Sequence, residues 1–161
     1  MNHYVLDLYR QMFLSLRRGR SGNRKSNAKP IFLLSVIEIV PYLKENLIPL
    51  SDPLLREYYK TNCEAYDTGK SSPLILPYYH MHTEPFYSLC WNDEDNITSI
   101  SPSPSVKELL QYIRGSKFDD ELWELLQDES NRSYLRECLI KYYFTSEKNN
   151  EHRKWQQHIT T

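Results

Sequence analysis

The charged residues of the first 29 positions carry the clearest chemical signal in the sequence. No acidic residue occurs between Asp7 and Glu38, whereas from Glu38 onward the chain has 13 Lys and Arg against 20 Asp and Glu. The formal net charge of −1 therefore hides two regions of opposite sign. Cations gathered in one segment favour a polyanion, and a solvated basic loop without a ligand is the alternative. The cations of this segment are Arg10, Arg17, Arg18, Arg20, Arg24, Lys25 and Lys29.

Two histidines and a cysteine form a second, weaker candidate for chemistry. The aromatic-rich runs 77–81 and 86–91 are separated by four residues, which predicts a β-hairpin. In such a hairpin His80 and His82 share one face and Cys90 lies on the partner strand, a conceivable metal site that lacks a fourth ligand. The acidic run 93–95 has no lysine beside it, as a carboxylate nuclease would require. We therefore predict no metal, no cofactor and no catalytic residue, although an unrecognised metal-dependent nuclease site stays an alternative.

Composition limits the organisation of the chain. With 161 residues, of which 40% are hydrophobic, the sequence is long enough for one core, so we expect a single domain over 1–161 with a polar tail over 146–161. Three widely spaced cysteines, Cys63, Cys90 and Cys138, do not suggest a disulfide framework. The sequence shows neither a signal peptide nor an apolar run long enough for a membrane span, so a cytoplasmic location is expected.

Hydrophobic spacing predicts an α+β, mainly α-helical fold, with about six helices around the small antiparallel hairpin. An amphipathic helix is expected over 3–17, an exposed loop over 21–27, and a nearly all-apolar helix that Pro30 opens and Pro41 ends. Asp52 is the expected cap of a third helix, and residues 47–50 are a candidate short strand. Three further helices are expected. Their predicted caps are Ser105 with Glu108, then Asp119 or Asp120, then Ser130 or Asn131, and Gly115 is the predicted end of the first of them.

The order of these features resembles a known family, the sulfur-binding domain found N-terminal to the HNH nuclease of phosphorothioate-dependent restriction endonucleases. The segment 28–34, Ala-Lys-Pro-Ile-Phe-Leu-Leu, is similar to the basic–proline–apolar start of a family helix. The segment 76–81, Leu-Pro-Tyr-Tyr-His-Met, is similar to the family's proline–aromatic strand, and 119–126 and 135–144 are similar to its closing helices. The resemblance covers most of residues 20–145.

The resemblance implies a site for modified DNA. The family holds the sulfur of a phosphorothioate against a proline ring and anchors neighbouring phosphates with cations. By position, Pro77 would supply the ring, Tyr78, Tyr79 and His80 would lie beside it, and Lys29 would meet a phosphate at a helix N-terminus. The other phosphate-binding residues would be Arg17, Arg18, Arg20, Arg24 and Lys25. Ala28, Leu76 and His80 differ from the polar, aromatic and small residues of the family pattern.

The expected function is accordingly that of a restriction-type DNA-binding module that recognises phosphorothioate-modified or otherwise modified duplex DNA. Family members carry a separate HNH domain, and no nuclease motif occurs in this chain, so the resemblance implies recognition without cleavage. Duplex DNA is the expected partner, and a separate nuclease subunit is a second candidate partner. The alternative is an interaction or regulatory subunit that keeps the fold and binds no DNA.

Overall fold

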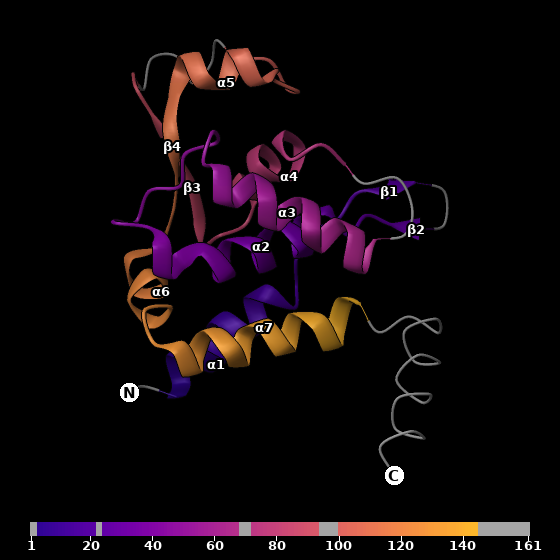
Figure 1. The fold of residues 1–161 in the computed structure, drawn as a ribbon, viewed down its shortest axis with the longest axis vertical. Coiled ribbons are helices and arrows are strands. Elements are labelled where there is room, and N and C mark those ends of the chain that lie inside the picture. Colours follow the sequence, from indigo (N-terminus) through magenta and orange to yellow (C-terminus); the bar gives the residue numbers. More distant parts are fainter. Residues whose placement is uncertain (1–2, 22–23, 68–71, 94–99, 145–161) are drawn as a thin grey trace.

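The structure, a computed structural model, describes residues 3–21, 24–67, 72–93 and 100–144. In this part of the chain seven α-helices and two short antiparallel strand pairs are present (Figure 1). The helices are α1 (His3–Phe13), α2 (Ala28–Ile39), α3 (Pro53–Tyr66), α4 (Ile75–His80), α5 (Val106–Tyr112), α6 (Asp120–Leu125) and α7 (Glu129–Tyr143). The strands are β1 (Arg20–Ser21), β2 (Arg24–Lys25), β3 (Tyr87–Trp91) and β4 (Ile113–Phe118), and 3₁₀ turns follow α2 at Val40–Tyr42 and α4 at Met81–Thr83. The α+β, mainly helical prediction is confirmed.

Helix α2 lies at the centre of the core because it is apolar on all sides. Nine of its residues are buried, and it packs against α3, α4 and α7. Helix α1 lies alongside α7 (Figure 1), with Phe13 buried against Phe86 at a ring distance of 5.0 Å. A helix without a polar face cannot lie at the surface, so its neighbours must enclose it. The sequence-based prediction for this helix is confirmed, with its start at Ala28 and Pro30 in the first turn.

The helix caps agree with the predictions only in part. The Asp52 carboxylate accepts the Leu55 N–H at 3.0 Å, as expected for the cap of α3. Ser105 caps α5, but Glu108 accepts from the Ser101 hydroxyl at 2.7 Å instead of completing a capping box. The predicted caps of α7, Ser130 or Asn131, are wrong. The cap is Asp128, two positions before Ser130, and its carboxylate accepts the Ser130 N–H at 2.8 Å.

The predicted hairpin is wrong, because its first strand is a helix. Residues 75–80 form α4, in which Pro77 occupies the first turn, where a missing N–H costs nothing. The fully buried Tyr78 donates its hydroxyl to the Ile48 carbonyl at 2.6 Å, and Tyr87 donates to the Tyr78 carbonyl at 2.6 Å. Strand β3 pairs instead with the distant β4. Tertiary packing of the tyrosines thus overrides a local aromatic pattern that favours a strand.

Gly115 does not end a helix, as predicted, but lies inside β4. A Cβ at this position would come within 2.8 Å of Leu47 Cδ1 and 3.0 Å of the Ile48 carbonyl oxygen. The close approach lets Ile48 and Ser116 exchange backbone hydrogen bonds of 2.7 and 3.0 Å. The candidate strand over 47–50 is therefore a single bridge onto β4, and glycine is required by contact with that segment.

The basic segment folds back on itself. Instead of the predicted loop, β1 and β2 pair as a two-residue ribbon, with Arg20 opposite Lys25 and Ser21 opposite Arg24. The predicted tail over 146–161 lies outside the described residues, and the single-domain organisation stays a prediction. No disulfide joins Cys63, Cys90 and Cys138. None of the helices in the described segments is long and apolar enough to cross a membrane.

Candidate phosphate-binding pocket

An open pocket of about 510 Å³ brings together residues from both predicted groups. We call it the basic pocket. Its walls come from the segment after α1, the N-terminal turn of α2, and the unit formed by α4 and the following 3₁₀ turn. The lining residues are Arg17, Arg18, Gly19, Ser26, Ala28, Lys29, Ser72, Leu76, Pro77, His80 and Thr83. Segments more than 40 positions apart in sequence therefore share one site.

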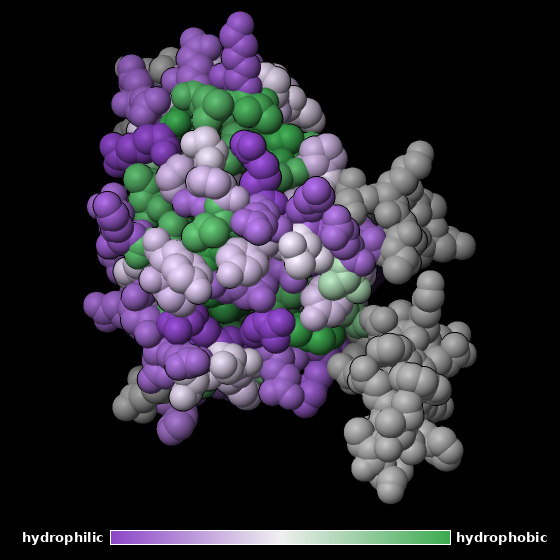
Figure 2. Space-filling model, in the orientation of Figure 1, coloured by the Kyte–Doolittle hydropathy of each residue, from purple (hydrophilic) through white to green (hydrophobic). Residues whose placement is uncertain are grey.

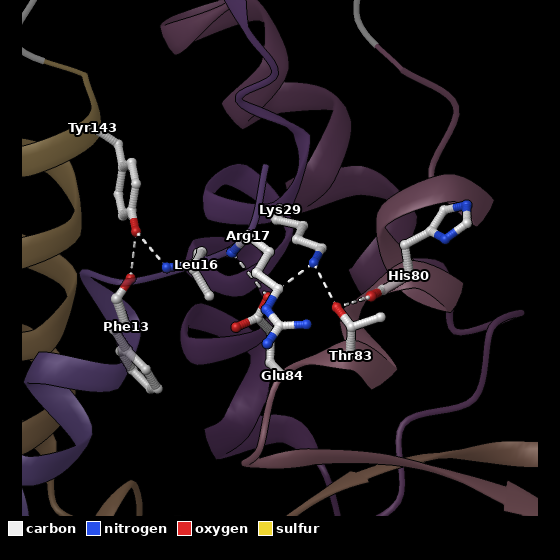
Figure 3. A network of polar contacts seen from close by, with 8 residues as sticks. All are labelled: Phe13, Leu16, Arg17, Lys29, His80, Thr83, Glu84 and Tyr143. Carbon is white, nitrogen blue, oxygen red and sulfur yellow. Dashed lines mark hydrogen bonds and ion pairs between the residues drawn. The ribbon is translucent and has the colours of Figure 1, made fainter. Parts of the chain in front are cut away.

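Lys29 is held at the inner end of this pocket by two acceptors (Figure 3). Its ammonium nitrogen lies 2.8 Å from Glu84 Oε2 and 2.9 Å from the Thr83 hydroxyl. The same carboxylate oxygen accepts the Arg17 backbone N–H at 3.0 Å. Both charged side chains are largely buried, with exposures of 12% for Lys29 and 4% for Glu84. Glu84 thus ties the α2 terminus, the segment after α1 and the turn after α4 to one point.

The segment that carries Arg17 and Arg18 is fixed from its other side by α7. The Tyr143 hydroxyl donates to the Phe13 carbonyl at 2.6 Å and accepts the Leu16 N–H at 3.2 Å (Figure 3). Arg18 lies over the Tyr143 ring, 4.8 Å from its centroid, and donates to Asn27 Oδ1 at 3.2 Å. Burial raises the pKa of Tyr143 to about 12, so this phenol keeps its donor proton at neutral pH. The Arg17 side chain is exposed, whereas that of Arg18 is half-buried.

The wall that α4 contributes to the pocket is largely apolar. Pro77 is buried with its ring on the pocket, and Leu76 is 38% exposed. His80 lies at the end of this wall, and partial burial, followed by the charge of Lys29, lowers its pKa below the ordinary value of 6.5. The imidazole is therefore mainly neutral at pH 7. The lining of the pocket thus combines cations from the segment after α1 and the start of α2 with hydrocarbon and an uncharged ring from α4.

The structure does not bring every predicted residue into this pocket. Tyr78 is enclosed in the core, and Tyr79 lines a separate groove of about 300 Å³. Lys25 is exposed on β2 outside the pocket lining, and Arg20 and Arg24 lie in the paired strands. We call the second site the aromatic groove. Its lining residues are Tyr79, His82, Tyr87, Ser88, Leu89, Trp91 and Ile100.

The residue that sequence reasoning missed is Glu84. It stands in the sequence between His82 and Pro85, in a stretch interpreted as a turn. An acid in a turn is ordinarily solvated, and no spacing rule links position 84 to Lys29, 55 positions earlier. Only the path of the chain places the two side chains together.

The conceivable metal site is not assembled. His80 lines the basic pocket, His82 lines the aromatic groove, and Cys90 lines a third hollow beside Arg114 and Lys117. Within the described residues, no group of three His, Cys, Asp or Glu side chains is arranged to hold a metal ion. The hairpin that would have aligned these residues does not exist, because 75–80 is helical.

Comparison with known proteins identifies the fold. No family model matches the sequence, and no curated protein matches it. Among solved structures, the chain is similar to the sulfur-binding and SRA domains of ScoMcrA complexed with phosphorothioated DNA, with a TM-score of 0.65 and 17% identity. That match covers 84% of this chain and 42% of the other, so the chain spans less than half of that structure.

Two further solved structures agree. The sulfur-binding domain of ScoMcrA alone, complexed with phosphorothioated DNA, matches with a TM-score of 0.63 and 17% identity over 84% of this chain and 87% of that one. The Type IV phosphorothioation-dependent restriction endonuclease ScoMcrA matches with a TM-score of 0.62 and 14% identity over 84% of this chain and 25% of that one. The chain has the fold of a sulfur-binding domain, and the resemblance noted in the sequence is confirmed at the level of the fold.

Proposed function

We propose that the chain is a DNA-binding module that places one backbone phosphate of a duplex in the basic pocket and recognises a phosphorothioate there. The observation that carries this proposal is the pairing of two unlike walls in one pocket. Arg17, Arg18 and Lys29 come from the segment after α1 and the start of α2, and Leu76 and Pro77 come from α4. The fold similarity to domains complexed with phosphorothioated DNA supports the same reading.

The two walls suit the two parts of a phosphorothioate. Its non-bridging oxygen keeps negative charge and accepts hydrogen bonds from guanidinium and ammonium groups. Its sulfur is larger, more polarisable and less strongly hydrated than oxygen. It therefore loses little hydration free energy when it leaves water to contact a proline ring and a leucine side chain. An ordinary phosphate oxygen on the same apolar wall would lose its water without a donor in exchange. The apolar wall would therefore favour the modified group.

The N-terminal turn of α2 adds to the positive side. Ser26, Ala28 and Lys29 line the pocket at the start of this 12-residue helix, where the Ala28 N–H donates to the Ser26 hydroxyl at 3.2 Å, Pro30 has no N–H, and the Lys29 N–H lacks a helical acceptor. Duplex DNA is the proposed partner, and cleavage would require a separate nuclease subunit.

A second candidate function, protein binding, is favoured by Val106 and Leu110 of α5, which are 48% and 50% exposed. Figure 2 shows an apolar area at the end of the molecule where α5 lies.

A direct test measures the affinity of the purified chain for two matched duplexes that differ in one phosphorothioate. We expect binding to both at low salt, with a preference for the modified duplex that persists at higher salt, because apolar contact is not screened. Binding of neither duplex at 50 mM salt would refute the DNA-binding proposal. Equal affinity for both would reduce it to recognition of ordinary backbone phosphate.

A further inference from the structure

A buried carboxylate, that of Glu84, lies directly behind the Lys29 and Thr83 side chains that line the basic pocket. Glu84 is 4% exposed, and its Oε2 lies within hydrogen-bond distance of both Lys29 Nζ and the Arg17 N–H (Figure 3). Its own backbone is fixed, since the Glu84 N–H donates to the Met81 carbonyl at 2.9 Å. A negative charge beside a bound phosphate opposes that phosphate. A site built only for strong phosphate binding would not place one there.

Glu84 limits what Lys29 can offer to a ligand. An ammonium group has three protons, and two of the three point at Glu84 and Thr83, at 2.8 and 2.9 Å. One proton is left for a ligand in the pocket. The charge of Lys29 is also matched by that of Glu84, so the net positive charge facing a ligand comes from Arg17 and Arg18. His80 adds none at neutral pH because its pKa is lowered.

We propose that Glu84 is a positioning residue that sets the discrimination between modified and ordinary phosphate, acting through Lys29. This inference rests on the proposed function. By neutralising Lys29, Glu84 keeps the charge attraction of the pocket weaker than the free-energy cost of dehydrating an ordinary phosphate oxygen on the apolar wall. Dehydration of a sulfur atom costs less free energy, so contact with Leu76 and Pro77 decides which group binds. Specificity then comes from restrained attraction, with Lys29 held in one place to orient the remaining oxygen.

The test replaces Glu84 by the neutral isostere in Glu84→Gln. The amide oxygen still accepts the Arg17 N–H, while the charge of Lys29 is no longer matched. We expect affinity for the ordinary duplex to rise by about threefold or more, the slope of log affinity against log salt to steepen by about 0.9, and the preference for the modified duplex to fall. Glu84→Asp, which keeps the charge, should retain the preference of the parent.

Two controls separate this role from simple structural support. Glu124→Gln makes the same change in net charge at an exposed position of α6, on the opposite side of the molecule from β1 and β2 (Figure 1), and should leave preference and slope unchanged. The double variant Lys29→Gln with Glu84→Gln removes both charges, so its salt slope should equal that of the parent. A thermal melt followed by circular dichroism verifies folding of each variant.

The outcomes are distinct. If the parent binds no duplex, both the proposed function and this inference fail. If the parent prefers the modified duplex but Glu84→Gln weakens both duplexes alike or leaves the salt slope unchanged, only the inference fails. Should Glu84→Gln not fold, the double variant decides alone. If the salt slope of the double variant is flatter than that of the parent by about 0.9, the value for one phosphate contact, then Lys29 acts as an unmatched cation and the inference is overturned.

Discussion

The basic pocket and the aromatic groove flank the same short helix, yet they offer opposite chemistry. Positions 76, 77 and 80 of α4 face the pocket with its three cations, whereas Tyr79 faces a groove that no lysine or arginine lines within the described part of the chain. Between them, Tyr78 is fully buried. The difference shows that one turn of helix can separate two surfaces because successive side chains point about 100° apart. Of these two surfaces, the basic pocket is the one suited to an anionic ligand.

The two surfaces are nevertheless in contact. The Tyr79 ring lies 5.2 Å from that of His80 in the pocket and 4.8 Å from that of His82 in the groove, in edge-to-face arrangements. Hydrogen bonds also hold the chain segment beside the pocket in place, since Tyr143 and Glu84 bond to the backbone of residues 13–17 from two sides. The comparison therefore predicts that changes in the pocket alter DNA binding, while changes in the groove alter it little.

The largest effect is expected from the double variant Arg17→Ala with Arg18→Ala. Loss of two cations should weaken binding to all duplexes by about tenfold or more and flatten the salt slope by about two, without lowering the preference for sulfur. The matched groove variant, Tyr79→Ala with His82→Ala, should bind within about twofold of the parent. Fluorescence anisotropy over a salt series measures both. Equal losses in the two variants would contradict the assignment of phosphate binding to the basic pocket alone.

A change on the apolar wall should act on preference. In Leu76→Asp and Pro77→Asp a carboxylate replaces hydrocarbon, so the advantage of sulfur should disappear and the affinity ratio of the two duplexes should approach one. Leu76 is partly exposed, which makes its variant the safer one for folding. Leu110→Asp, which makes the same substitution at a somewhat more exposed leucine on α5, is the control and should keep the preference. A folded Leu76→Asp protein that discriminates as the parent does would remove this wall from the site.

The core position between the two surfaces should separate stability from binding. Tyr78→Phe removes the hydroxyl that donates to the buried Ile48 carbonyl, which is then left without that donor. Because the Ile48 carbonyl still accepts the Ser116 N–H at 3.0 Å, we expect the free energy of unfolding to fall by about 0.5–1.5 kcal/mol in a urea titration. The ratio of affinities for the two duplexes should change by less than about twofold. A large change in that ratio would place Tyr78 in the site after all.

The sequence was sufficient to predict those features that depend on local chemistry. The all-apolar pattern of α2, the Asp52 cap of α3 and the segregation of the cations each follow from composition within about a dozen residues. Pro77, Lys29 and His80 were expected beside one another from the family resemblance, and the structure places all three on one pocket. Their roles in binding stay a prediction.

Features that depend on distant partners could not be predicted. Residues 77–81 have the aromatic content of a strand, but the buried hydroxyl bond of Tyr78 to Ile48 and the pairing of β3 with β4 make them helical. Gly115 was interpreted as a helix end because its contact with Leu47 is not visible in the sequence. Glu84 was missed for the same reason, since its partner Lys29 lies on another element.

The smallest effect is expected from pH, and it distinguishes the two histidines. Burial and nearby positive charge lower the pKa of both His80 and His82, so both are mainly neutral at pH 7. Because an anion in the basic pocket favours the protonated imidazole of His80, binding takes up a proton and affinity should rise modestly, by less than about threefold, between pH 8 and pH 6. His80→Gln should abolish this rise, whereas His82→Gln should retain it.

The same pKa shifts set the lower limit of that experiment. A histidine whose folded-state pKa is depressed binds fewer protons than in the unfolded chain, so the folded state loses stability as pH falls below the ordinary value of 6.5. Affinities are therefore best compared at pH 6 and above, with a thermal melt at each pH. If His80→Gln keeps the full pH dependence while His82→Gln loses it, the anion lies nearer the aromatic groove, and the division between the two surfaces of α4 is wrong.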